Sequence, residues 1–383
     1  MRVTQPAASP RRVLLVADCV GGVWQYSLEL AGGLSDGGVE VVLAVAGPPP
    51  SAAQRAQAEA IRGLRIAILD VGLDWLADGE RELAPLRERL LALAEREEVD
   101  LVHLNGAGLG DLPTDRPVIA TQHSCLATWW QAMRPDEPLP AAWRWHRARM
   151  ASGLRAAAAV IAPSAAFAAQ IRRAYGADLE LEVVRNGRSQ HRFRPAARRQ
   201  AVVITAGRLW DEAKNVRTLD AAAAGVSWPV LAAGPTEGPD GHRVGLANAF
   251  ALGAIDAAEM RRRLARAGVF VSLAAYEPFG LAVLEAALSG CALVLSDIPT
   301  FRELWGEVAL FVAPDDPGAA RAAINRLIAD RGLRATLAER ARRRALTYAP
   351  EACTQATLEV YRRVLHGAAR PHASDGDLLR AAG

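Results

Sequence analysis

Short apolar segments alternate with segments of helical periodicity along most of this sequence. In the first half the apolar segments are Arg12–Asp18, Val39–Ala46, Leu64–Val71, Asp100–Asn105, Pro117–Thr121, Val160–Pro163 and Glu180–Val184. The helical segments between them include Val23–Ser35, Ser51–Arg62, Glu80–Glu97 and Ser164–Tyr175. Apolar strands separated by helices are typical of a parallel sheet with helices on both faces. The alternation therefore predicts a doubly wound α/β fold.

The same alternation begins again in the second half. Apolar strands are expected at Ala201–Thr205, Pro229–Ala233, Val269–Ala275, Cys291–Leu295 and Val308–Val312. Helices are expected at Ala257–Ala267, Gly280–Ser289, Pro317–Ala329, Leu333–Leu346 and, last, Pro350–Leu365. A chain of 383 residues is long enough for two domains that each have a core. We therefore expect two parallel-sheet domains.

The composition restricts the class of protein. Hydrophobic residues make up 51% and charged residues 23% of the chain, which is ordinary for a soluble globular enzyme, and a net charge of +3 gives no argument for nucleic-acid binding. The cysteines at 19, 125, 291 and 353 have no metal-binding spacing, which favours reduced thiols. No apolar run has the length of a membrane span, and Met1–Arg12 lacks the apolar core of a signal peptide. We expect a cytoplasmic protein and leave peripheral membrane contact open.

Glu277 and Glu285 lie on either side of the expected start of the helix Gly280–Ser289. Glu285 has mostly apolar neighbours one turn away, where a charge is costly unless a partner is present. Ligand hydroxyls are such partners, and the free amides of Phe279, Gly280 and Leu281 would attract an anion beside Glu277. The combination suggests a nucleotide-sugar site. The alternative is that Glu277 caps the helix and that Glu285 reaches solvent.

Two cations follow the strand Ala201–Thr205. Arg208 lies just beyond the strand end, and Lys214, the one lysine among 45 basic residues, lies near the start of the next helix. Residues at these two places can converge on one anion. The alternative is a pair of solvated surface charges.

Further candidates lie at strand ends of the first half. Gly21 and Gly22 follow the first strand, where paired glycines let a ligand approach the backbone, although a plain tight turn has the same pattern. The glycines do not form G-x-G-x-x-G, which disfavours a dehydrogenase. His123 follows another strand, at the edge where open α/β sheets bind ligands, or it is a structural histidine.

Four of the nine tryptophans lie between residues 127 and 150. Exposed indoles bind sugar rings, whereas buried ones pack helices. We hypothesise that Trp129 or Trp130 forms an edge of an acceptor pocket, and helix packing is the alternative.

Several of these segments together resemble one enzyme family. Glu277-Pro-Phe-Gly-Leu-Ala-Val-Leu-Glu285 resembles the E-x7-E signature of retaining glycosyltransferases of the GT-B fold, in particular family 4. Gly21–Ser27 resembles the family's glycine-rich first loop, and Gly207–Lys214 resembles its basic segment with one extra residue. Asn186-Gly187, followed by Phe193-Arg194-Pro195, resembles the crossing between the two domains, with Ser189 where the family has aspartate. The resemblance covers about residues 12–365.

The resemblance implies a GT-B architecture, in which two Rossmann-like domains face a cleft. Residues 1–190 would form the acceptor-side domain and 191–346 the nucleotide-sugar domain. The last helix, 347–366, would cross back to the first domain and leave a disordered tail at 367–383.

The resemblance also implies roles for individual residues. The catalytic group would be His123, Arg208, Lys214 and Glu277, and Trp129 or Trp130 would contact the acceptor. The donor would be bound by Gly21, Gly22, Asn186, Gly187, Gly207, Gly234, Phe279, Gly280, Leu281 and Glu285.

The implied reaction is a retaining hexosyl transfer from a UDP- or GDP-sugar to a hydroxyl of a small-molecule, glycan or lipid acceptor. No cofactor and no metal are expected, and Asp375-Gly376-Asp377 lies in the expected tail, where we discount it as a metal site. The alternatives are a nucleotide-sugar epimerase or phosphorylase on the same scaffold, and a non-catalytic nucleotide-sugar binding protein.

Overall fold

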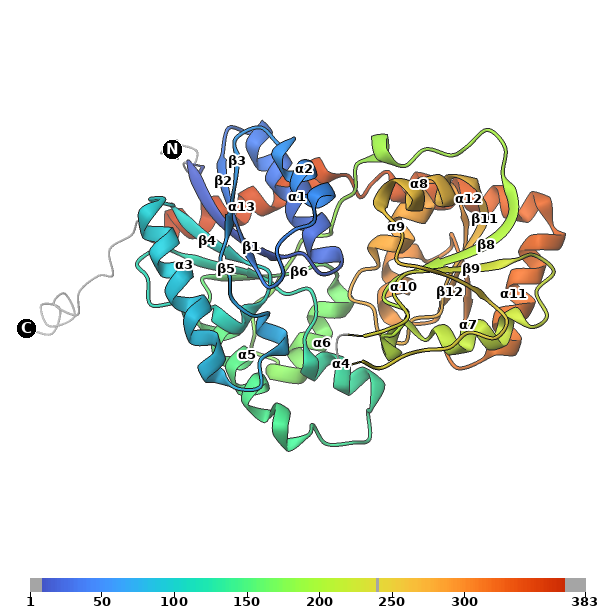
Figure 1. The fold of residues 1–383 in the computed structure, drawn as a ribbon, viewed down its shortest axis with the longest axis horizontal. Helices are drawn as coiled ribbons and strands as arrows, with labels where there is room; N and C mark the ends of the chain where they lie inside the picture. The colour runs from blue at the N-terminus through green and yellow to red at the C-terminus, as the bar shows by residue number, and fades with distance from the viewer. Residues whose placement is uncertain (1–8, 239–240, 369–383) are drawn as a thin grey trace, which may run out of the picture.

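The computed structural model describes residues 9–238 and 241–368, which form two α/β halves side by side (Figure 1). The first half contains a seven-stranded sheet in the order β3-β2-β1-β4-β5-β6-β7, and each neighbouring pair is parallel. Its strands are β1 Arg12–Asp18, β2 Glu40–Ala46, β3 Leu64–Ile68, β4 Leu101–Leu104, β5 Val118–Thr121, β6 Ala159–Ala162 and β7 Glu182–Val183. Its helices are α1 Gly22–Asp36, α2 Ala52–Glu59, α3 Ala84–Arg96, α4 Leu126–Met133, α5 Arg144–Ala156 and α6 Ala165–Tyr175.

The second half contains a six-stranded parallel sheet in the order β10-β9-β8-β11-β12-β13. The strands are β8 Gln200–Ala206, β9 Val230–Ala233, β10 Phe250–Gly253, β11 Ala267–Ser272, β12 Ala292–Ser296 and β13 Leu310–Val312. The helices are α7 Val216–Ala223, α8 Ala257–Arg266, α9 Leu281–Leu288, α10 Pro299–Trp305, α11 Pro317–Ala329 and α12 Arg331–Ala345. The prediction of two parallel-sheet domains is confirmed.

The strand order fixes where a ligand would lie. In the first sheet the chain builds outward on one side of β1 and then continues on the other side with β4; in the second sheet β8 and β11 have the same relation. Open α/β sheets bind ligands beyond the carboxyl ends of the strands at such a switch point. The loops after β1, β8 and β11 are therefore the expected site loops.

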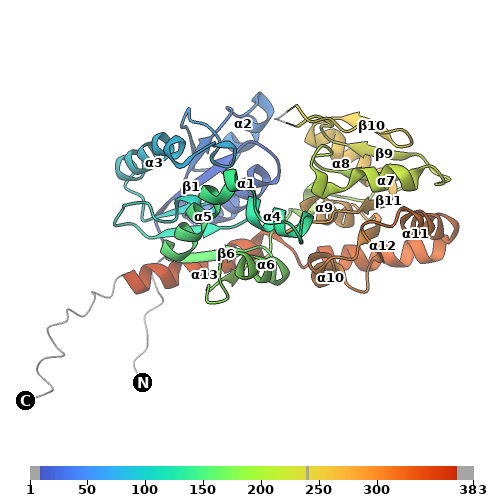
Figure 2. The same cartoon turned by 90° about the horizontal axis from the view of Figure 1, so that it is seen from below.

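The last helix, α13 (Pro350–Ala368), returns to the first half (Figures 1 and 2). Its Tyr361 is fully buried among residues of β1 and α1, and its hydroxyl is hydrogen-bonded to Nδ1 of His103 on β4. The predicted crossing of this helix is confirmed, and its end is two residues beyond the predicted 366. The rest of the expected tail, with the Asp375-Gly376-Asp377 segment, lies outside the described residues.

Two predicted boundaries were wrong. The helix predicted from Glu80 begins as a 3₁₀ turn at Glu80–Leu83, and α3 starts at Ala84 with Pro85 in its first turn, where a missing N–H is tolerated. The strand predicted to reach Ala275 leaves the sheet after Ser272, and the amide of Ala275 donates instead to the carbonyl of Ala213. This departure carries the following residues toward the other half.

Direct contacts join the two halves beside the site loops. The Ser164 hydroxyl caps α6 by accepting from the Phe167 amide, and it donates to the Pro278 carbonyl at 2.7 Å. The Thr128 and Tyr276 hydroxyls lie 2.8 Å apart.

Within the described residues, no helix has both the length and the apolar character that a membrane span requires.

Candidate functional site

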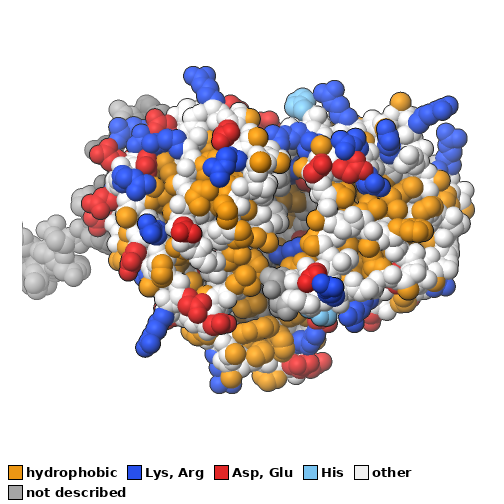
Figure 3. Space-filling model, in the orientation of Figure 1, with side chains coloured by type: hydrophobic (Ala, Val, Ile, Leu, Met, Phe, Trp, Pro, Cys, Tyr) orange, Lys and Arg blue, Asp and Glu red, His pale blue; other side chains and the backbone are white. Residues whose placement is uncertain are grey.

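The glycine loop after β1 faces the start of α9 across the boundary between the two halves. A Cβ added at Gly22 would lie 3.2 Å from Cδ1 of Leu281, so these two helix starts are in close contact. Gly21 and Gly280 precede the two helices with φ of 90° and 89°, a backbone conformation that favours glycine. In Figure 3 the halves meet along a furrow that contains basic side chains. The predicted loop and helix end therefore lie together.

Lys214 and Glu277 form an ion pair in this region, with Nζ 2.6 Å from Oε2. Lys214 ends a 3₁₀ turn, Glu212–Lys214, that the Asp211 side chain caps. The Lys214 side chain runs past Gly207, where an added Cβ would lie 3.8 Å from its Cδ. Both partners of the pair are mostly buried.

Glu277 does not cap α9, because this helix has no side-chain cap at its first turn. The amides of Val283 and Leu284 donate to the Gly280 carbonyl, while those of the preceding residues have no partner inside the helix. The alternative in which Glu277 is a cap is therefore wrong. Within the described part of the chain, the amides at the helix start thus have no hydrogen-bond partner, and they lie beside the Lys214–Glu277 pair.

Arg208 is paired with Asp211, its Nη2 3.0 Å from Oδ2, and its guanidinium lies 5.5 Å from the centre of the Trp210 ring. The other oxygen of Asp211 accepts a hydrogen bond from Nε1 of Trp129 at 3.3 Å. Arg208 and Lys214 thus follow the same strand but have different acidic partners. Their convergence on one anion stays a prediction.

Glu285 is not exposed to solvent as the alternative interpretation had it, because it is paired with an arginine that sequence reasoning missed. Nε and Nη2 of Arg188 each lie 2.8 Å from Oε1 of Glu285, and Nη1 lies 2.9 Å from Oε1 of Glu29 on α1. Arg188 is only 4% exposed. The signal in the sequence was Glu285 itself, since a carboxylate on an apolar face needs a cation or donors nearby.

His123 lies at the end of β5 and is held by Asn105. The Asn105 amide nitrogen donates to the Val16 carbonyl and to the Ser27 hydroxyl, so its oxygen accepts from Nε2 of His123 at 2.9 Å. This network fixes the tautomer that carries its proton on Nε2. Burial lowers the pKa of His123 to about 4, so the ring is neutral near pH 7.

Asp18 ends β1 and was not among the residues singled out from the sequence. Its Oδ1 accepts the Val20 amide at 2.6 Å. Burial, with a further contribution from the nearby Asp74, raises the pKa of Asp18 to about 6. The loop after β1 therefore begins at a carboxyl group that is harder to ionise than an exposed aspartate.

The remaining predicted glycines bring backbone segments together. A Cβ added at Gly234 would overlap the carbonyl oxygen of Gly207. A Cβ added at Gly187 would lie 2.5 Å from the carbonyl oxygen of Ala349. Gly187 lies on the segment that leads from the first half into the second (the first crossing), and Ala349 lies on the segment that leads back to α13 (the second crossing). The two crossings thus pack against each other at Gly187. The neighbouring Asn186 is buried, and among the described residues its Oδ1 has no hydrogen-bond partner. Donor contact by these residues stays a prediction.

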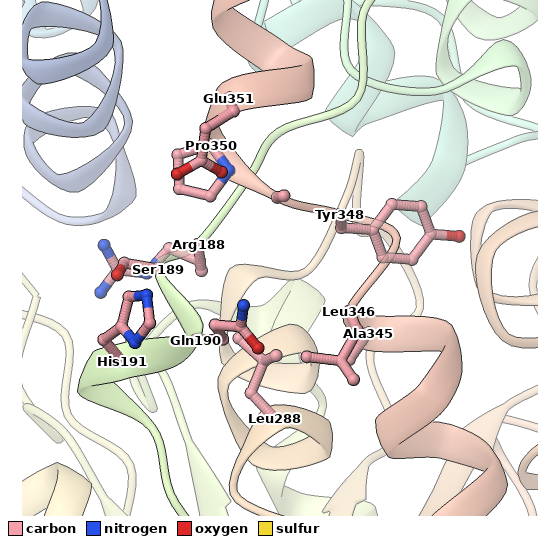
Figure 4. Close-up of a pocket in the computed structure, with 11 residues that line it drawn as sticks. Arg188, Ser189, Gln190, His191, Leu288, Ala345, Leu346, Tyr348, Pro350 and Glu351 are labelled. Carbon is pink, nitrogen blue, oxygen red and sulfur yellow. The ribbon is translucent and has the colours of Figure 1, made fainter. Parts of the chain in front are cut away.

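Beside this crossing lies a small cavity of about 30 Å³. Figure 4 shows its lining from the two crossing segments, including Arg188, His191 and Pro350. Its volume suits about one water molecule. This cavity is too small for a nucleotide sugar.

The predicted acceptor tryptophans differ in their surroundings. Trp130 packs edge-on against Trp143 at 5.3 Å, and its Nε1 donates to the Glu137 carbonyl, as a helix-packing residue would. Trp129 reaches the second half through Asp211, and Figures 1 and 2 both place α4 beside that half. Trp129 is the better placed of the two for a role at the site.

Comparisons with known proteins agree with this arrangement. Residues 20–192 match the family model described as Glycosyltransferase Family 4, and residues 188–344 match the model described as Glycosyl transferases group 1. Glycogen synthase of Mycobacterium tuberculosis is 29% identical over a match that covers 67% of this chain and 66% of that protein. The match thus spans slightly less than two thirds of this relative's length.

Solved structures show the same fold. Sucrose-phosphate synthase of Thermosynechococcus elongatus superposes with a TM-score of 0.77 at 21% identity, over 93% of this chain and all of that one. HepE of Anabaena, solved in complex with UDP and glucose, superposes with a TM-score of 0.70 at 19% identity, over 91% of this chain and 98% of that one. At these identities the likeness concerns the GT-B fold.

Proposed function

The chain belongs to the family 4, group 1 glycosyltransferases, and from this premise we propose that it transfers a sugar from a UDP- or GDP-sugar to an acceptor hydroxyl with retention of configuration. One observation carries the proposal. The Lys214–Glu277 ion pair lies beside the uncapped start of α9, which faces the glycine loop at Gly22. A cation and free amides next to a carboxylate suit a diphosphate next to a sugar.

Negative charge grows on the leaving diphosphate as the donor's glycosidic bond breaks. Groups that stabilise this charge make the largest contribution to catalysis in reactions of this kind. Lys214, Arg208 and the free amides at the start of α9 are the positively polarised groups available for it. Glu277 would accept hydrogen bonds from donor-sugar hydroxyls with the oxygen that Lys214 leaves free.

The opposite wall of the cleft supplies neutral groups. His123 carries its proton on Nε2 and is neutral near pH 7, so it suits hydrogen bonding to a sugar hydroxyl better than to a phosphate. This wall would receive the acceptor and the sugar. Trp129 would form an edge of the acceptor pocket.

The similar proteins suggest which donor and which acceptor to test first. Because HepE has been solved with UDP and with UDP-glucose, a UDP-sugar is the first donor to test. A glycogen synthase among the relatives makes a glycan the first acceptor class to test. GDP-sugars and small-molecule or lipid acceptors follow.

A thermal-shift panel of UDP- and GDP-sugars tests the donor site, because a ligand that binds the native state raises the melting temperature by mass action. We expect stabilisation by one nucleotide class, followed by transfer that keeps the donor's anomeric configuration in the product. No stabilisation by any member would contradict the proposal. A changed sugar without an acceptor would indicate an epimerase, and binding without turnover would indicate a binding protein.

We also propose that transfer needs no metal ion, since Lys214, Arg208 and the helix start provide positive charge where the diphosphate would lie. The test is an assay in EDTA and in added Mg²⁺. Equal rates are expected. A rate that depends strictly on Mg²⁺ would overturn this part of the proposal.

A further inference from the structure

We propose that Arg188 is a positioning residue for nucleotide binding, which holds the carboxylate of Glu285 in the orientation that accepts the ribose hydroxyls of the donor. The inference rests on the proposed function and on the donor-binding role that the resemblance gives Glu285, and it takes the ribose to be the part of the donor that Glu285 binds. The resemblance gives Arg188 no role, whereas the inference gives it one.

Arg188 lies on the first crossing between the two halves and is fixed on several sides. Its amide donates to the Tyr348 carbonyl on the second crossing at 3.1 Å. Its guanidinium lies 5.2 Å from the centre of the Phe193 ring and is 4% exposed. A buried guanidinium held in this way has little rotational freedom left to lose when a ligand binds.

The contacts of the guanidinium are divided between the two halves. Nε and Nη2 contact Glu285 on α9, and both bonds fall on Oε1. Nη1 contacts Glu29 on α1 at 2.9 Å and Gln25 Oε1 at 3.3 Å. One cation thus lies between a carboxylate of each half.

Among the residues that the structure describes, Oε2 of Glu285 has no hydrogen-bond partner, which leaves it to a ligand. A carboxylate oxygen has two lone pairs, and a ribose presents two neighbouring hydroxyls that can donate to it. With Oε1 fixed, Oε2 points in one direction before the donor arrives, and preorganisation of this kind favours binding. We expect Arg188 to act on the direction of the carboxylate, because the positive charge of Arg261 on α8 also acts on Glu285 and is kept in an Arg188 variant.

The test compares affinities for UDP, 2′-deoxy-UDP and 3′-deoxy-UDP by titration calorimetry, or for the guanosine series if the panel selects GDP. The wild-type protein should bind the ribonucleotide roughly 10-fold more tightly than a deoxy analogue, the size of one charge-assisted hydrogen bond. Arg188→Gln should reduce this ratio to below about 3-fold and change the affinity for the deoxy analogues little. Arg188→Lys, which keeps the charge without the fork, should fall between the two.

Arg185→Gln is the matched control. Arg185 lies three residues earlier on the same segment and also pairs across the halves, with Glu303 at 3.2 Å. Its removal breaks an ion pair between the halves at a distance from Glu285, so the ribo-to-deoxy ratio should not change. A merely structural role of Arg188 would weaken all three ligands equally and leave the ratio at the wild-type value.

The outcomes separate the two proposals. A folded Arg188→Gln or Arg188→Lys protein with the wild-type ratio overturns the inference and leaves the proposed function standing. A wild-type protein that binds UDP but does not distinguish the deoxy analogues overturns the role of Glu285 and the inference with it. A wild-type protein that binds no nucleotide overturns the proposed function itself.

Discussion

The two walls of the cleft differ in how they treat charged side chains. The wall from the second half carries paired charges, with Lys214 on Glu277 and Arg208 on Asp211. On the wall from the first half, here called the neutral wall, burial disfavours charge: it lowers the pKa of His123 to about 4, so that the ring is neutral near pH 7, and it raises the pKa of Asp18 to about 6. A charged diphosphate suits the first wall, and an uncharged hydroxyl suits the second.

The two walls also differ in what determines the charge of their side chains. Ion pairs keep charges available in a partly buried site, because each charge has a partner until the ligand replaces it. Burial without a partner of opposite charge favours the neutral form instead.

The largest effect is expected for Lys214→Ala, which removes the cation of the charged wall. If Lys214 stabilises the leaving diphosphate, kcat should fall by roughly 10²-fold or more. Steady-state kinetics with a saturating donor measure this. Lys214→Arg keeps the charge and should recover part of the rate. A Lys214→Ala enzyme with unchanged kcat and raised donor KM would limit the residue to binding.

The charged wall could be predicted from the sequence in part. Glu277, Arg208 and Lys214 were singled out because they lie at strand or helix ends of a predicted α/β fold, and such ends converge on a ligand. Glu285 was singled out as a charge on an apolar helix face. The pairing of these residues could not be predicted. Arg188 is 97 residues from Glu285 and 159 from Glu29 in the sequence, so only the packing of the domains brings them together.

The neutral wall was less visible in the sequence. Asp18 was predicted as the last residue of a strand, and nothing in its neighbours indicates the burial that raises its pKa. The alternation of apolar segments predicted the sheets well because a period is a local property. Strand ends such as that at Ser272 depend on bonds to distant segments, here the carbonyl of Ala213 to the amide of Ala275, and were predicted less well.

The second prediction concerns His123. Its pKa of about 4 in the folded protein lies below the ordinary value of 6.5, so between these values the unfolded chain binds more protons. Stability should therefore fall as the pH falls through this window, by about 2 kcal/mol from pH 7 to pH 5 for this one group. Urea unfolding of the wild type and of His123→Gln at both pH values measures it.

The glutamine side chain of the His123→Gln variant keeps a donor for Asn105 and does not titrate, and His103, whose pKa burial also lowers, is present in both proteins. The pH-dependent loss should therefore be about 2 kcal/mol smaller in the variant. Equal losses in the two proteins would show that His123 is not neutral by burial.

The third prediction has the opposite sign. The pKa of Asp18 in the folded protein, about 6, lies above the ordinary 3.8, so its contribution to stability is present below pH 3.8 and is lost as the pH rises through 6. Asp18→Asn keeps the oxygen that accepts the Val20 amide and removes the charge. It should stabilise the fold by about 3 kcal/mol at pH 7 and by much less at pH 4. A destabilised Asp18→Asn protein at pH 7 would mean that the carboxylate has a cationic partner.

The smallest effect is expected where the two walls touch. Trp129 donates from Nε1 to Asp211, whose other oxygen holds Arg208. Trp129→Phe keeps most of the ring and removes the donor, so Asp211 should draw Arg208 closer and weaken its contact with the diphosphate. We expect donor KM to rise by about threefold, since the lost hydrogen bond is long, at 3.3 Å, and acts on the diphosphate only through Asp211 and Arg208. Trp130→Phe is the matched control and should leave donor KM unchanged. A rise in acceptor KM for Trp129→Phe alone would place the indole at the acceptor pocket, and equal kinetics for both variants would show that the neutral wall does not influence the charged one through this contact.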